Sequence, residues 1–133
     1  MPDPQLYVTD THTLLWYLYD LPLLSPAAQT AFSEIESGEA ILLIPAIVLA
    51  EVIFTVERRR HDIDVTEVLD RIAAADNYRV LPFDLQAARR LPNVTPISEM
   101  HDRMIVCEAL AHQATLITRD EEIRRAGVVQ TVW

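Results

Sequence analysis

Short apolar runs typical of buried strands alternate with helical segments along the whole chain, and this alternation most restricts the fold. Capping signals and helical spacing fill the intervals between the runs. Strands that alternate with helices favour crossover connections and a parallel sheet. We therefore expect a single α/β domain, a three-layer α/β/α sandwich with a mostly parallel central sheet. The domain is expected over residues 1–133, with strands at Leu6–Val8, Ile41–Ile44, Arg79–Leu81, Thr115–Thr118 and Val128–Val132.

The expected helices begin and end at recognisable signals. Ser25 and Pro26 give an N-cap followed by a proline at the first helical position, and Gly38 ends that helix. Basic residues at 58–60 suit a helix C-terminus. The helices are predicted over 13–19, 26–37, 46–60, 64–75, 84–91 and 99–112, with a last short one between Asp120 and Gly127.

Composition limits the function. The chain has 20 acidic and 11 basic residues, a net charge of −9, and all the basic residues are arginine. Such a chain does not hold nucleic acid by bulk charge, although bound divalent cations can reverse the local sign. One cysteine, Cys107, forms no internal disulfide and is expected to be a small buried hydrophobe in a cytoplasmic protein. The N-terminus carries no signal-peptide pattern, and the apolar runs fall short of the roughly 20 residues that a membrane span needs.

Four acidic residues occupy unusual places in this pattern. Asp10 ends the first strand, and Asp120 follows the fourth. Carboxyl ends of parallel strands meet at one edge of the sheet, where ligands bind in open α/β folds. Glu51 lies about a turn and a half into the helix after the second strand. Asp102 opens the helix before the fourth strand, and only the fold can bring it to the same edge.

Four neighbouring carboxylates repel one another and do not all stay ionised without a compensating charge. Mg²⁺ or Mn²⁺ supplies that charge, because hard cations take oxygen ligands and retain waters. One or two such ions can generate a metal-bound hydroxide for phosphodiester hydrolysis. The expected products carry 5′-phosphate and 3′-hydroxyl ends.

Each acid also has an ordinary structural interpretation. Asp10 and Asp120 suit N-caps of the helices that follow them. Asp102, in a first helical turn, is favourable to the helix dipole whatever its function. Glu51 on a long helix could face solvent or pair with an arginine of Arg58–Arg59.

Four segments resemble the PIN-domain ribonucleases, and more closely the VapC-type toxins of bacterial type II toxin–antitoxin systems. Val8–Trp16 resembles the family's Asp-Thr-His-x-Leu-x-Trp start, and Pro45–Val52 its segment with a glutamate. His101–Leu110 resembles an Asp-Arg-x-Ile-x-x-x-Ala-Leu helix, and Leu116–Asp120 a Leu-x-Thr-x-Asp strand end. The segments keep the family's order. Members of this subgroup often carry Pro-Phe before the third-motif aspartate, where this chain has Met100-His101.

The resemblance implies a PIN-like fold and an Mg²⁺- or Mn²⁺-dependent endoribonuclease that acts as a toxin. It further implies a homodimer with RNA as substrate, inhibited by an antitoxin whose C-terminal tail lies near the active site. Thr118 corresponds to a position whose hydroxyl helps to order the site, and the fourth acid, here Asp120, is the family's least constant ligand. The metal ligands and catalytic residues implied are Asp10, Glu51, Asp102 and Asp120.

Other polar and aromatic residues near these motifs have two interpretations. Arg103 and Arg119 flank acids and are candidate RNA phosphate contacts, since a guanidinium suits bidentate phosphate binding, but they suit ion pairs equally. His12 and His101 could act as bases or serve in packing and capping. Trp16 is expected to pack in a core or partner surface rather than to stack on bases.

Rival functions are less consistent with the sequence. A receiver domain or a haloacid-dehalogenase-type phosphatase needs a lysine, and this chain has none. With two glycines, it has neither a P-loop nor a dinucleotide fingerprint. The alternative from another class is a PIN-like binding module, catalytically weak, which would keep its partner affinity when Asp10 or Asp102 becomes asparagine.

Overall fold

Five parallel strands form the centre of the molecule in the computed structural model, which describes residues 3–59 and 62–133. Their order across the sheet is β3-β2-β1-β4-β5, and each neighbouring pair is parallel. The predicted parallel sheet is therefore confirmed. The strands are β1 (Gln5–Thr9), β2 (Ala40–Pro45), β3 (Tyr78–Leu81), β4 (Thr115–Ile117) and β5 (Thr131–Val132).

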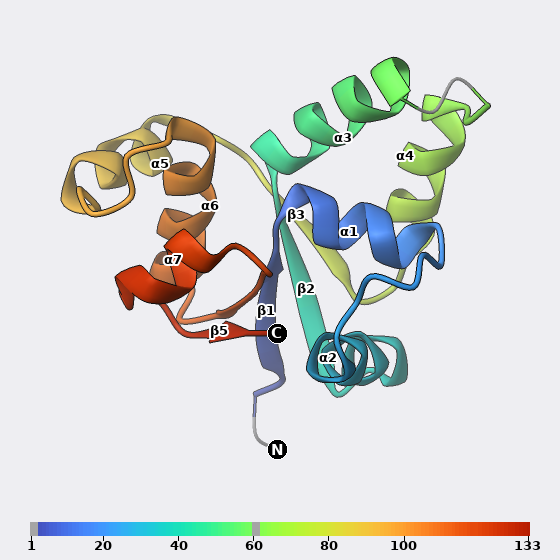
Figure 1. Ribbon diagram of the computed structural model, residues 1–133, viewed down its shortest axis with the longest axis horizontal. Coiled ribbons are helices and arrows are strands. Elements are labelled where there is room, and N and C mark those ends of the chain that lie inside the picture. The colour runs from blue at the N-terminus through green and yellow to red at the C-terminus, as the bar shows by residue number, and fades with distance from the viewer. Residues whose placement is uncertain (1–2, 60–61) are drawn as a thin grey trace.

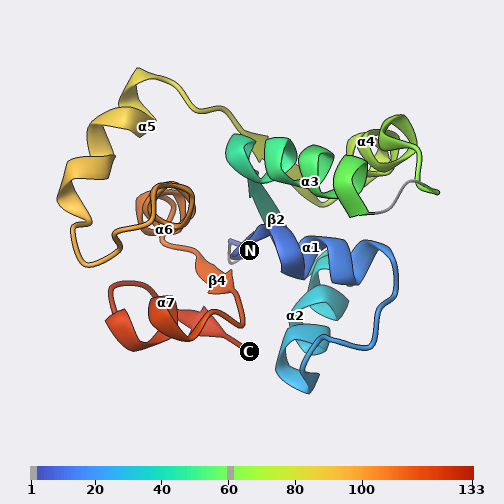
Figure 2. The same cartoon turned by 45° about the horizontal axis from the view of Figure 1, so that its top comes forward.

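Helices flank the sheet on both sides, as predicted for a three-layer sandwich. Figures 1 and 2 show α1 to α4 gathered on one side of β1 and α5 to α7 on the other. No helix in the described ranges is long and apolar enough to cross a membrane. The helices are α1 (Thr11–Leu18), α2 (Pro26–Ser37), α3 (Ala46–Arg59), α4 (Val65–Ala74), α5 (Leu85–Arg90), α6 (Met100–Ala111) and α7 (Glu121–Ala126), with a short 3₁₀ turn η1 (Leu91–Asn93).

Most predicted ends of helices and strands agree with the structure within two residues. Helix α1 begins at Thr11 rather than Thr13, because the Asp10 side chain accepts a hydrogen bond from the Thr13 amide and caps the helix. Strand β5 is shorter than the predicted 128–132 and begins at Thr131. The predicted end of α3 at Arg60 lies outside the described residues.

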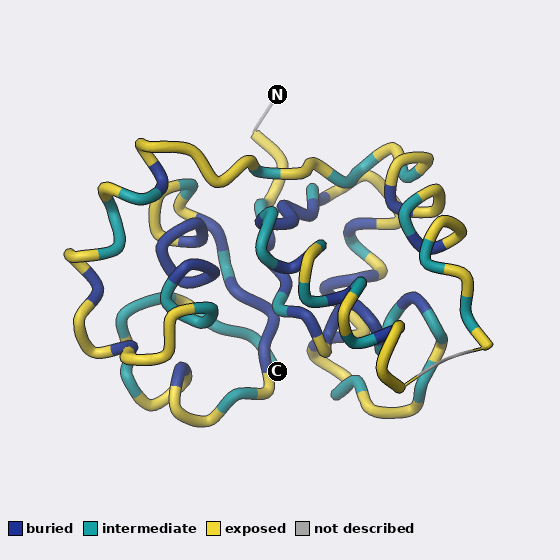
Figure 3. Tube along the Cα trace, turned by 90° about the horizontal axis from the view of Figure 1, so that it is seen from above, coloured by how far each residue is buried: buried dark blue, intermediate teal, exposed yellow. Residues whose placement is uncertain are grey.

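The core lies between the central strands and the inner faces of the helices (Figure 3). Val8, Leu42 and Leu116, from three neighbouring strands, have no exposed surface. On α2, Phe32 is 1% exposed, and its ring stacks on that of Tyr17 with centroids 4.1 Å apart. Burial of such side chains supplies most of the driving force for folding.

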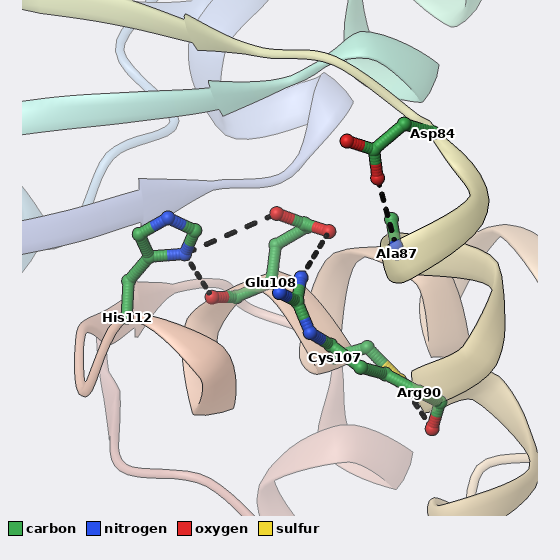
Figure 4. A network of polar contacts seen from close by, with 6 residues as sticks. All are labelled: Asp84, Ala87, Arg90, Cys107, Glu108 and His112. Carbon is green, nitrogen blue, oxygen red and sulfur yellow. Dashed lines mark hydrogen bonds and ion pairs between the residues drawn. The ribbon is translucent and has the colours of Figure 1, made fainter.

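A polar network around the buried Glu108 joins α5 to α6 (Figure 4). The Glu108 carboxylate lies 3.6 Å from Arg90 and 3.9 Å from His112, and burial raises its pKa. The Cys107 thiol, buried and free as predicted, donates to the Arg90 carbonyl at 3.6 Å. Asp84 caps α5. The contacts of Arg90 with Glu108 and Cys107 thus link α5 to α6, the helix that carries Asp102.

Candidate active site

The strand order creates a crevice between β1 and β4. The chain passes from β1 to β2 and β3 on one side, then returns to place β4 on the other side of β1. Ligands bind at such a change of direction, beyond the carboxyl ends of the strands. Thr9 is in register with Ile117, so the residues that follow them, Asp10 and Thr118, emerge together at this edge.

A threonine hydroxyl links the acids that follow these two strands. Thr118, fully buried, donates through Oγ1 to Asp10 Oδ2 at 2.5 Å and accepts from the Asp120 amide at 3.1 Å. The other Asp10 oxygen caps α1, and Asp120 caps α7 through the Ile123 amide. The capping interpretation of both aspartates is therefore correct, and it leaves both carboxylates at the crevice.

Glu51 reaches the same crevice from α3. Its Oε1 accepts a hydrogen bond of 2.7 Å from the hydroxyl of Thr11, the residue directly after Asp10. Within residues 3–59 and 62–133, the ion pairs within 4.0 Å do not join Glu51 to Arg58 or Arg59, so the arginine pairing considered from the sequence is wrong. Arg58 instead lies over the ring of Phe54, with 6.0 Å to the ring centroid. Sequence reasoning did not single out Thr11 as a site residue, although it follows Asp10 directly and is the threonine of the Asp-Thr-His motif.

Asp102 enters the crevice from the first turn of α6. Glu99 caps this helix by accepting from the Asp102 amide at 2.7 Å, and its other oxygen lies 2.7 Å from His101 Nδ1. Burial raises the pKa of Asp102 to about 6, with further contributions from neighbouring acids. Those acids are Asp120, Glu99, Asp10 and Glu51. The raised pKa therefore reflects first the burial of Asp102 and then the negative charge of the acids around it.

The four predicted acids line one cavity of about 350 Å³. Of the two predicted phosphate contacts, Arg119 lines this cavity, whereas Arg103 does not and donates to the Ile97 carbonyl at 2.5 Å. His12 lines it as an exposed side chain, and His101 does not. The remaining lining residues are Thr11, Thr13, Trp16, Thr55 and Ile105.

The donor set of the cavity has the chemistry that a hard divalent cation prefers, since all four candidate ligands are carboxylates. Within residues 3–59 and 62–133, however, no three acidic, histidine or cysteine side chains converge as a ready metal cage. Mg²⁺ is commonly held through one or two carboxylates and retained waters, so this looser arrangement fits it.

Comparison with known proteins identifies the family. The PIN domain profile matches residues 7–129, nearly the whole chain. The chain therefore belongs to the PIN-domain family, and the resemblance seen in the sequence to that family is confirmed. A search of curated proteins finds no match.

Solved structures show the same fold. VapBC2 from Rickettsia felis, bound to a promoter DNA fragment, matches with a TM-score of 0.73 at 18% identity, over 96% of this chain and 97% of that one. A toxin–antitoxin complex from Klebsiella pneumoniae matches with a TM-score of 0.66 at 20% identity, over 96% of each chain. The PIN domain endonuclease Utp24 matches with a TM-score of 0.52 at 18% identity, over 92% of this chain and 77% of that one.

Proposed function

We propose that this protein is a Mg²⁺- or Mn²⁺-dependent endoribonuclease and the toxin of a toxin–antitoxin pair, acting in the cytoplasm. One observation carries the proposal: four carboxylates from four separate segments line a single cavity at the carboxyl edge of the sheet. PIN-domain membership supports nuclease chemistry. The similarity to VapBC2 and to the Klebsiella pneumoniae complex supports a toxin with a protein antitoxin as partner.

Each residue of the cavity has a role in this proposal. Asp10, Glu51, Asp102 and Asp120 would hold the cation, which supplies Lewis-acid activation for phosphodiester hydrolysis when bound. Two threonine hydroxyls position three of these acids: Thr118 holds Asp10 and the backbone of Asp120, and Thr11 holds Glu51. Groups of this kind orient ligands and commonly matter nearly as much as the ligands themselves.

The proposal is tested by incubating cellular RNA with the purified chain and Mg²⁺ or Mn²⁺. We expect discrete fragments that disappear with EDTA and with Asp10→Asn. Asparagine is a good N-cap, so this variant keeps the cap on α1 and stays folded while one candidate ligand is lost. Cleavage that persists in EDTA, or in a well-folded Asp10→Asn protein, would contradict the proposed site.

The ends of the fragments report the nucleophile. Hydrolysis by water yields 5′-phosphate and 3′-hydroxyl ends, which ligation and phosphatase treatment can distinguish from other ends. Fragments that end in 2′,3′-cyclic phosphate would mean that the RNA 2′-hydroxyl attacked, and the proposed chemistry would be wrong.

The substitution Thr118→Val is expected to lower cleavage about 10- to 100-fold. Valine preserves shape, but Asp10 loses a donor and the Asp120 amide loses its acceptor in a buried place. We also expect a loss of about 1–3 kcal/mol in the free energy of unfolding. Thr118→Ser is the matched control, because it keeps the hydroxyl and should retain most of the activity. Equal losses in both variants would show that packing, rather than the hydroxyl, matters.

A catalytically weak binding module is the second candidate, favoured by the absence of a ready three-ligand cage among the described residues. It predicts that Asp10→Asn and Asp102→Asn leave partner binding intact and that no RNA is cleaved by the well-folded, unsubstituted chain. Sedimentation of the purified chain tests the homodimer that we propose alongside the nuclease.

A further inference from the structure

Arg119 is the one arginine among the described residues that line the acidic cavity. It is exposed and directly precedes Asp120. Within residues 3–59 and 62–133, the ion pairs within 4.0 Å do not include it, although four carboxylates share its cavity. Its guanidinium carbon instead lies over the Trp16 ring, 4.7 Å from the centroid. In the described part of the chain, the guanidinium of Arg119 therefore has a cation–π contact with Trp16 in place of an ion pair with the acids.

A second tryptophan, Trp133, packs against Trp16. The rings of Trp133 and Trp16 meet edge to face, with centroids 5.9 Å apart and 61° between their planes. The sheet explains this contact: Ile117 pairs with Val132, so Trp133 follows β5 beside the end of β4, where Arg119 emerges. Both tryptophans are half-buried. We call Trp16 and Trp133 the indole platform.

The indole platform leaves the guanidinium able to bind a phosphate. A stacked guanidinium uses its flat face for the ring, while its N–H groups, which lie in the plane, stay available to phosphate oxygens. An arginine folded onto the carboxylates would instead neutralise them and compete with a cation. An RNA strand entering this cavity meets four acids, and Arg119 is the cation placed to offset the repulsion of its phosphates.

We propose that the indole platform positions Arg119 to bind a phosphate of the RNA strand next to the one that is cleaved. The inference rests on the proposed function, since its ligand is the RNA substrate. Trp16 and Trp133 are positioning residues here, acting through the guanidinium. The indole platform thus determines how the RNA strand lies across the acidic cavity.

Salt dependence of binding tests the inference, because each phosphate contact of a single strand contributes about 0.7 to the slope of log Kd against log salt. A fluorescent single-stranded RNA is titrated with Asp10→Asn protein, free of divalent metal, over a salt series. Adding Arg119→Gln should lower the slope by about 0.7 and weaken binding about tenfold at low salt. Arg89→Gln, which removes an exposed arginine of α5 outside the cavity, should leave the slope unchanged.

Changes at Trp16 separate positioning from simple packing. Trp16→Leu, which is apolar but has no aromatic face, should lower the slope nearly as much as Arg119→Gln. Trp16→Phe should keep most of the slope of the unsubstituted platform. The slope of the double variant Trp16→Leu/Arg119→Gln should be no lower than that of Arg119→Gln alone. Melting temperatures confirm that each variant is folded. An unchanged slope in Arg119→Gln overturns the inference, as does weaker binding by Trp16→Leu without a change of slope, which would mean that a base stacks on the ring.

Cleavage assays keep this inference separate from the proposed function. If the unsubstituted chain cleaves RNA but Arg119→Gln does not change the slope, the platform proposal alone is wrong. If the chain does not cleave RNA but the slope falls as described, the nuclease proposal is wrong, and of the platform proposal only the binding of an RNA phosphate by Arg119 stands. An absence of RNA binding at low salt overturns both.

Discussion

Substitution of Asp102 by asparagine is expected to lower RNA cleavage at least about a hundredfold and, in metal-free protein, to raise the melting temperature at about pH 8. The two effects have one cause. Asp102 is half-buried, and its negative charge is close to those of Asp120, Glu99 and Asp10. The negative charge would help to bind a cation, whereas in metal-free protein the same charge destabilises the folded state.

The pH dependence follows from the direction of the pKa shift. Burial and the neighbouring acids raise the pKa of Asp102 from 3.8 to about 6, so the folded chain holds this proton more tightly than the unfolded chain. The resulting stabilisation is complete below the unfolded value and is lost as the pH rises through the folded value. Asparagine does not titrate, so Asp102→Asn should melt at a higher temperature than the unsubstituted chain at about pH 8. The difference in melting temperature should vanish at about pH 3.5.

Thermal melts in EDTA at both pH values measure this effect, with Glu57→Gln, an exposed acid of α3, as the matched control. Added Mg²⁺ should then raise the melting temperature of the unsubstituted chain more than that of Asp102→Asn, because a ligand of the folded state stabilises it by mass action. Equal melting of Asp102→Asn and the unsubstituted chain at the higher pH would show that the acids do not crowd Asp102.

Substitution of Phe32 by alanine is expected to lower the free energy of unfolding by about 3–5 kcal/mol. The ring is 1% exposed and stacks on Tyr17 with an angle of 7° between the planes. Its removal leaves a cavity between α2 and α1 that the helices can close only in part. Since a domain of this size has about 5–15 kcal/mol of stability, this one change threatens the fold.

Phe54→Ala is the matched control for Phe32→Ala, because the same side chain on α3 is 60% exposed. We expect Phe54→Ala to cost no more than about 1 kcal/mol. Urea denaturation gives both values, and similar denaturant slopes would show that the unfolded states are comparable. Similar losses in the two variants would contradict the packing described for α2.

Much of the fold followed from local sequence patterns. Apolar runs such as Ile41–Ile44 specify strands, and signals such as Ser25 and Gly38 specify helix ends, because capping and periodicity depend on neighbours along the chain. Asp10 and Asp120 were predicted at the same sheet edge because, in a parallel sheet, a residue that follows a strand emerges at that edge.

Only the tertiary structure decided which side chains of the helices reach the site. Glu51 reaches Thr11 rather than an arginine, and Asp102 joins the other acids, because α3 and α6 pack in particular orientations on the sheet. From the sequence, Arg103 and Arg119 were equal candidates for RNA phosphate contacts. In the structure, of these two only Arg119 lines the cavity, and it lies over Trp16. These contacts join residues far apart in the chain, and side-chain direction at such distances depends on packing between elements rather than on local propensity.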